Sequence, residues 1–173
     1  RWGPADKRML IANETELVDT FASPDSNNTV DFHSASYFLR YSSNMQVVRS
    51  ITSTAKNAFS ADSANVAQTL KNEDVFAAQE SFLISEQNTF LGRYPGDLAN
   101  GLTIERCVAG DSAAFLNWKY APEFDAKPET STFISNKNGQ NDEIHVVVVD
   151  AQGKFTGTKG AVLERYPLLS VAK

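Results

Sequence analysis

The chain has 173 residues, of which 42% are hydrophobic, and its formal net charge is −5. This composition is that of an ordinary globular protein, and the length suits one domain or two small ones. A weakly acidic chain argues against nucleic acid as the main partner, because phosphate binding needs clustered lysine and arginine. No apolar run approaches the length of a membrane span and no signal peptide is visible, so we expect no membrane partner. The single cysteine, Cys107, excludes an internal disulfide.

The first 52 residues predict a strand, two helices and a second strand. Short apolar runs at residues 7–12 and 45–51 have strand character. Asn13, with Glu16 three residues later, forms a capping box that opens a helix, and Pro24 ends it. A second helix is expected over residues 31–43. Two strands separated by helices suggest a crossover unit with both strands in one sheet.

The middle of the chain is less regular. Residues 52–65 are rich in Ser, Ala, Thr and Asn, which indicates a linker or an elaborated turn. A short helix is expected around residues 66–70, and residues 71–87 have helical spacing but could equally be irregular. A short extended piece at 89–92 and turns at 94–97 and 100–101 follow. Residues 102–108 predict a strand, residues 115–118 a loop or half-turn packed on the core, and residues 130–135 an edge strand.

The stretch from Glu143 to Arg165 predicts a hairpin around which the rest is organised. Its first strand contains four consecutive valines, which disfavour helix and suit a sheet that is buried on both faces. Turn residues follow at Asp150 to Gly153, where glycine can adopt a positive φ. We therefore predict an α+β (mixed α/β) fold. A strand–helix–helix–strand unit over residues 1–52 precedes a β-rich, sandwich-like domain with few short helices over residues 53–173.

Candidate catalytic and metal-binding residues are few. His33 lies in a predicted helix and His145 in the buried strand, and neither has a cysteine or carboxylate at ligand spacing. Cys107 is interpreted as a small buried hydrophobic residue and not as a nucleophile. Asp142 and Asp150 flank the predicted strand of eight residues, which separates them by roughly 26 Å. That is too far for paired acid–base chemistry, so solvated strand ends are the better interpretation.

Two further patterns also fail to define an active site. The glycines at positions 92, 96 and 101 are not followed by the lysine and helix of a phosphate-binding loop. Asp25, His33 and Ser36 could be arranged as a triad, but no nucleophile elbow supports it. We therefore predict no catalytic, cofactor-binding or metal-binding residues, and a binding or structural module is favoured over an enzyme.

Several stretches, in their order along the chain, resemble the contractile tail sheath proteins of T-even-like phages (myoviruses). They cover most of the chain and are Trp2-Gly3-Pro4, Leu17-Val18-Asp19-Thr20-Phe21, Tyr37-Phe38-Leu39-Arg40-Tyr41, Gln46-Val47-Val48-Arg49, Asn72-Glu73-Asp74, Tyr94-Pro95-Gly96, Asn100-Gly101-Leu102 and the 142–164 hairpin. The resemblance implies a structural protein of the virion tail, made in the host cytoplasm, whose subunits form stacked six-subunit rings around a tail tube. It also implies contacts with baseplate and neck proteins, and a contraction that drives the tube through the host envelope.

The resemblance also implies a division of the chain by role. Residues 1–52 would begin an inner α/β domain and residues 53–173 would form much of a protruding β-rich domain, both within a longer protein. Two other interpretations stay open. The first is the sheath of a bacterial contractile injection system, such as a tailocin or a secretion device. The second is an α/β hydrolytic enzyme built on the first unit.

Overall fold

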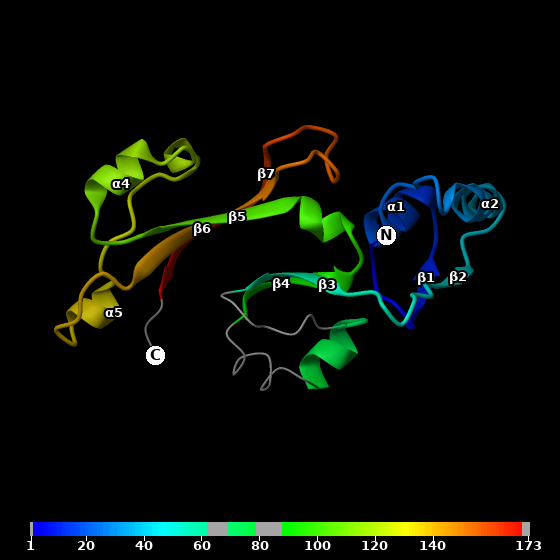
Figure 1. The fold of residues 1–173 in the computed structure, drawn as a ribbon, viewed down its shortest axis with the longest axis horizontal. Helices are drawn as coiled ribbons and strands as arrows, with labels where there is room; N and C mark the ends of the chain where they lie inside the picture. Colours follow the sequence, from blue (N-terminus) through cyan, green and yellow to red (C-terminus); the bar gives the residue numbers. More distant parts are fainter. Residues whose placement is uncertain (1, 62–68, 79–87, 171–173) are drawn as a thin grey trace. The chain divides into compact units, whose positions relative to one another are not determined.

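The computed structural model describes residues 2–61, 69–78 and 88–170, and it divides into two compact units. Unit 1 comprises Arg1–Asn100 and unit 2 comprises Gly101–Lys173. Figure 1 shows short helices and small sheets in both units. The predicted α+β class with a β-rich part is confirmed. The predicted helix around 66–70 lies mostly outside the described residues, as does the second half of the 71–87 segment.

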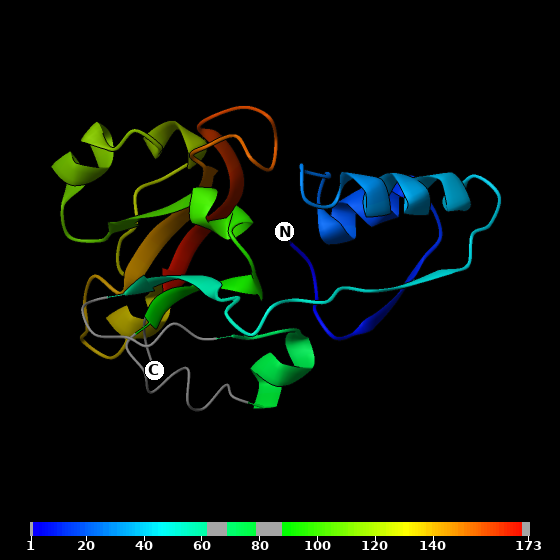
Figure 2. The same cartoon turned by 45° about the vertical axis from the view of Figure 1, so that its right-hand side comes forward.

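Unit 1 begins with the expected strand, two helices and strand: β1 (Arg8–Ile11), α1 (Glu14–Phe21), α2 (Thr29–Leu39) and β2 (Met45–Val48). The two strands pair in one sheet, as predicted, but they are antiparallel, from Arg8 opposite Val48 to Ile11 opposite Met45. The predicted crossover unit is therefore wrong. A single helix between two strands carries the chain back along the sheet, so that the second strand can run parallel to the first. Two successive helices add one more reversal of the chain, so the second strand runs antiparallel. Both helices lie on the same side of the strand pair (Figures 1 and 2).

Local signals set the bounds of helix α1. The Asn13 side chain accepts the Glu16 N–H at 2.9 Å, and the Glu16 carboxylate accepts the Ala12 N–H at 2.7 Å, as a capping box requires. Helix α1 ends at Ala22, whose φ of 64° leaves the helical region shortly before Pro24. On helix α2 the buried or half-buried side chains lie on one face, and they are those of Phe32, Ala35, Ser36 and Leu39.

The predicted linker after residue 52 is in part a strand, which is a correction. Residues Asn57–Ala61 form β3, which pairs antiparallel with β4 (Asn88–Pro95). Small polar residues have weak strand propensity, so tertiary context decides this element. The buried Asn57 amide donates to the Gly92 carbonyl at 2.9 Å and also receives the Leu70 N–H at 2.7 Å. A short helix over residues 73–78 lies between β3 and β4 in the sequence, and η1 (Leu98–Gly101) comes after β4.

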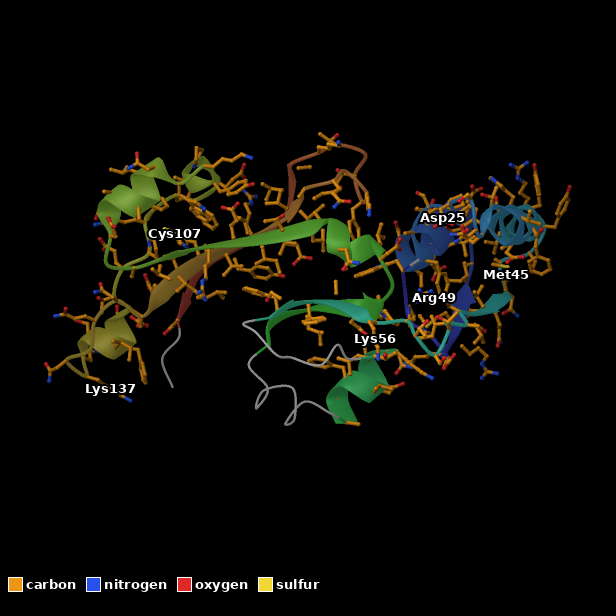
Figure 3. The ribbon with its side chains drawn as sticks, in the orientation of Figure 1. Asp25, Met45, Arg49, Lys56, Cys107 and Lys137 are labelled. Carbon is orange, nitrogen blue, oxygen red and sulfur yellow. The ribbon has the colours of Figure 1, made fainter. Side chains whose placement is uncertain are left out.

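Arg49 joins separate parts of unit 1, and Figure 3 labels it near β2. Its guanidinium donates to the Gly3 carbonyl at 3.0 Å and to the Pro95 carbonyl at 2.9 Å. Burial lowers the Arg49 pKa, which shows that this charge has lost water. The buried Asn72 amide likewise donates to the Ala5 carbonyl at 2.9 Å. Unit 1 is therefore held by buried and partly buried polar contacts between segments that lie far apart in sequence.

Unit 2 is built on an antiparallel sheet with the order β5–β6–β7. Its strands are β5 (Leu102–Val108), β6 (Glu143–Asp150) and β7 (Ala161–Ser170). The four-valine strand β6 is central, so the predicted hairpin and its central first strand are confirmed. Between β5 and β6 the chain forms α4 (Ser112–Asn117), η2 (Ala121–Glu123) and α5 (Thr132–Ser135).

The predicted edge strand at 130–135 is wrong, because Thr132–Ser135 is a helical turn. The Ser131 hydroxyl accepts the Ile134 N–H, which satisfies a donor at the start of the turn. This cap overrides the strand propensity of Thr132, Phe133 and Ile134.

The core of unit 2 lies on one face of β6. Val147 is fully buried and Val149 is 2% exposed, and both pack with Tyr120, Trp118 and Phe124. Side chains alternate along a strand, so His145 shares this face. On the other face Val146 is buried, whereas Val148 is half-buried. The prediction that Val147 and Val149 share one face is therefore confirmed, and that face holds the core.

We predict that Val147→Asp lowers the free energy of unfolding by several kcal/mol, because the new carboxylate would be buried without a partner. Urea denaturation followed by circular dichroism measures the change. Val108→Asp is the matched control, since Val108 lies on β5 of the same sheet and is 53% exposed. The control is expected to change stability by about 0.5 kcal/mol or less. Equal losses in the two variants would contradict the assignment of Val147 to the core.

Candidate functional site

The polar residues of strand β6 form the most highly organised site in unit 2. Asp142, immediately before the strand, is 5% exposed, His145 is 1% exposed and Asp150 is fully buried. The interpretation of Asp142 and Asp150 as solvated strand ends is therefore wrong. Charged side chains are rarely buried without partners. Each of these three residues fixes a different loop to the central strand.

Asp150 holds the loop that joins β6 to β7. Its carboxylate accepts the N–H groups of Lys154, Phe155 and Thr156 at 2.8–2.9 Å and the Thr156 hydroxyl at 3.0 Å. Burial alone would raise the Asp150 pKa, but these hydrogen bonds outweigh it and hold the pKa below its ordinary value of 3.8. The connection is thus a closed ten-residue loop and not the tight turn that the sequence suggested.

Asp142 performs a similar role at the start of the strand. It accepts the Ser131 N–H and the Ser131 hydroxyl, both at 2.7 Å, and also the Ser170 hydroxyl. Burial opposes ionisation, but these bonds outweigh it and the Asp142 pKa is lowered. The carboxylate therefore fixes the turn before α5 and the end of β7 to one point.

His145 connects two segments across the sheet face. Its Nδ1 accepts the Leu168 N–H at 3.0 Å, and its Nε2 lies 2.7 Å from the Ala126 carbonyl oxygen. An N–H can only donate and a carbonyl can only accept, so the ring is neutral with its proton on Nε2. The ring also stacks on Phe124, with centroids 4.1 Å apart and an angle of 3°.

A bulge in β7 makes the Leu168 contact possible. Ile144 pairs with Leu169 and Val146 with Tyr166, so β7 holds an extra residue opposite His145. Pro167 lies at this bulge on an edge strand, where a missing N–H is tolerated. Leu168 has a φ of 51°, and its N–H turns away from the ladder towards the imidazole.

The other residues considered from the sequence do not converge. His33 is exposed while Ser36 is buried, and Asp25 accepts the N–H of Asn27 in a local turn, so the three do not form a relay. Cys107 is buried on β5, as predicted (Figure 3). Burial, and then the negative charge of Asp111, raises its pKa and keeps the thiol protonated.

The side chains of Asp142, His145 and Asp150 hold the backbone of neighbouring segments. Within residues 2–61, 69–78 and 88–170, no group of three or more His, Cys, Asp or Glu side chains is placed to hold a metal ion. No helix in those ranges is long and apolar enough to cross a membrane. The buried acids and the histidine have their hydrogen-bonding capacity committed to the backbone and to serine and threonine hydroxyls. Their role is to position loops.

Sequence reasoning missed the buried contacts of Asp142, His145 and Asp150. Two features of the sequence indicate such contacts. Pro167 inside an apolar strand indicates a bulge or an edge. An aspartate followed by a run rich in Gly and Thr is typical of a carboxylate that accepts backbone N–H groups.

Comparison with known proteins finds similarity to tail sheath proteins of two phages. The chain is 36% identical over 163 residues, or 94% of its length, to the tail sheath protein of Salmonella phage ViI. It is 41% identical over 59 residues, or 34% of its length, to the tail sheath protein of Enterobacteria phage T4. The resemblance read from the sequence is confirmed, since the chain is similar to the tail sheath proteins of both phages.

The similarity concerns part of those proteins. The chain spans 23% of the length of the Salmonella phage ViI protein, and its match spans 9% of the T4 protein. No protein family profile matches the chain, and no solved structure matches it.

We predict that Asp150→Asn destabilises the chain and weakens its acid sensitivity. The folded pKa lies below the ordinary value, so the carboxylate stabilises the fold fully above pH 3.8 and loses that contribution as the pH falls further. An amide also presents one oxygen where the carboxylate presents two. Urea titrations between pH 2.5 and pH 6 measure both effects.

Asp125→Asn is the matched control for this titration, because Asp125 is exposed. It should leave the pH profile unchanged. An Asp150→Asn profile that overlays the parent profile would show that the loop does not depend on this carboxylate.

We predict that His145→Leu destabilises the chain by about 1–3 kcal/mol for each backbone group left unsatisfied, namely the Ala126 carbonyl and the Leu168 N–H. His33→Leu serves as the control, since His33 is exposed on α2. Nitrogen-15 NMR of the parent should show a protonated Nε2 in His145. A protonated Nδ1, or equal stability of the two variants, would rule out the proposed bridge.

Proposed function

We propose that this chain is part of the subunit of a contractile phage tail sheath. The observation that carries the proposal is the similarity over 94% of the chain to a tail sheath protein. In this role the subunits assemble as stacked six-membered rings around the tail tube, and contraction drives the tube through the host envelope. The other partners would be baseplate and neck or terminator proteins.

The geometry suits a segment of a protein whose role is to transmit force and not to catalyse a reaction. The ends of strand β6 are fixed by Asp142 and Asp150, and its centre by His145, so loops on both ends of the sheet are tied to one rigid element. Interiors that are close-packed transmit strain. The division into an inner domain over residues 1–52 and a protruding domain over residues 53–173 is part of this proposal, as a division by role in the particle.

A sheath of a bacterial contractile injection system would use the same architecture, and the two differ in what surrounds the gene. Capsid genes beside it would favour a phage, and tube and baseplate genes without a capsid would favour an injection device. The hydrolase alternative loses support, because the described residues Asp25, His33 and Ser36 do not form a relay.

Electron microscopy of the full-length protein tests the assembly, and hollow tubes of stacked rings are the expected result. The 173-residue chain alone is expected to be monomeric at micromolar concentration and physiological salt, because its formal net charge of −5 opposes tight self-packing. Sedimentation equilibrium measures that state. A full-length protein that stays monomeric under all tube-forming conditions would contradict the proposal. A stable dimer or hexamer of the short chain would instead place assembly determinants within these 173 residues and contradict the expected monomer.

A further inference from the structure

Residues 2–7 join two parts of unit 1, and we call this segment the clasp. The chain leads from the clasp directly into β1, so the clasp belongs by sequence to the strand–helix part, residues 8–48. It bonds to the β3–β4 part, which runs from residue 57 to residue 95. Among the residues that the structure describes, no hydrogen bond or ion pair connects the two parts directly. The clasp and Arg49 carry these connections.

The backbone of Ala5 is bound by the β3–β4 part as an extended peptide would be. Its N–H donates to the Lys71 carbonyl at 2.7 Å, and its carbonyl accepts the side-chain amide of Asn72 at 2.9 Å. Ala5 is fully buried, so both of its polar groups must find partners within the protein. Lys71 and Asn72 therefore act as a receptor for an extended backbone.

The neighbouring side chains restrict which sequence can occupy this position. Trp2 meets the Tyr94 ring edge to face, with centroids 5.3 Å apart and an angle of 79° between the rings. Gly3 has a φ of 94°, and a Cβ there would lie 2.7 Å from the Phe21 ring. Pro4 is fully buried. The site thus selects an aromatic residue, a glycine and a proline in that order.

The outer bonds of the clasp are weak. Asp6 pairs with Lys71 at 2.6 Å and Lys7 pairs with Asp74 at 2.8 Å, and the four side chains are 36–75% exposed. Exposed pairs of this kind contribute little to stability and are screened by salt. The clasp forms no helix or strand and has a single β-bridge to the rest of the chain. It can therefore open without breaking the β1–β2 or β3–β4 ladder.

We propose that the clasp occupies a peptide-binding site of the β3–β4 part, and that its release loosens the strand–helix part from that part. Lys71, Asn72 and Tyr94 define the site, and its ligand is an extended peptide with the sequence Trp-Gly-Pro-Ala. A bound clasp transmits a displacement of one part to the other, and a released clasp leaves each ladder intact. The clasp belongs to unit 1 alone, so this role does not rest on the proposed function.

Amide hydrogen exchange of the 173-residue chain, measured by NMR, tests the release. Gly3→Ala should raise the exchange rates of the Ala5 and Asp6 amides at least tenfold, because the added Cβ cannot fit against α1. Amides of the β1–β2 and β3–β4 ladders should keep the parent rates. Gly157→Ala is the matched control, since Gly157 also has a positive φ but a Cβ there meets nothing within 4 Å. The control should leave the Ala5 and Asp6 amides unchanged.

Trp2→Ala provides a second variant, because it removes the ring contact and adds no clash. It should speed exchange of the Ala5 and Asp6 amides even if Gly3→Ala fails to fold, and circular dichroism verifies the fold of each variant. Unchanged exchange of these two amides in the folded variants would overturn the proposal. Equal acceleration in both ladders would also overturn it, because the segment would then belong to one cooperative fold.

Peptide binding tests the site itself. An unlabelled peptide with the sequence of residues 2–7 is added to the nitrogen-15-labelled Trp2→Ala chain at millimolar concentration, which matches the effective concentration of a tethered segment. It should return the Lys71 and Asn72 amide signals to their parent positions. A peptide with alanine in place of Gly3 should need an at least tenfold higher concentration. Signals that do not move, or equal binding of the two peptides, would rule out the site.

Discussion

The buried carboxylate of Asp150 is the interaction on which the arrangement of unit 2 most depends. A charge can be buried only when hydrogen bonds replace its lost water, and here three backbone N–H groups and one hydroxyl do so. Burial alone would raise the pKa of this carboxyl, but the hydrogen bonds hold the pKa below its ordinary value. Because the donors belong to the loop and the acceptor to the central strand, the position of the loop follows from the position of β6.

The same principle recurs at the other end of the strand and in its middle. Asp142 attaches Ser131 and Ser170, and His145 attaches Ala126 and Leu168. Valines supply the apolar contacts between these polar residues, so one strand of eight residues contributes both the core and its attachments. Loops that are tied to a packed element shift with that element and not independently.

Much of the fold could be predicted from the sequence, and the reasons differ from element to element. Four valines in a row define β6 because their branched side chains suit a buried sheet, and Asn13 with Glu16 defines the start of α1 because the cap is local. Residues Asn57–Ala61 and Thr132–Ser135 could not be assigned in this way. The first depends on pairing with β4, about thirty residues away, and the second on a single hydroxyl of Ser131.

The candidate site was harder to predict than the fold. A charged residue at a strand end is usually solvated, so the sequence pattern predicts that Asp150 and Asp142 face solvent. Their partners come together only after the chain has folded, and no local pattern places Ser170 beside Asp142. Family resemblance, in contrast, was carried by short motifs whose order is preserved along the chain, and the similarity to tail sheath proteins confirms it.

Amide hydrogen exchange at Lys154, Phe155 and Thr156 tests the account of β6 most directly. Lys154 and Thr156 are exposed at their side chains, and a loose loop would exchange its amides as fast as an unstructured peptide. The account predicts slow exchange of these three amides at neutral pH, comparable with that of the β6 strand itself, and faster exchange for exposed loop amides that Asp150 does not hold. Exchange of all three at the rate of an unstructured peptide would contradict it.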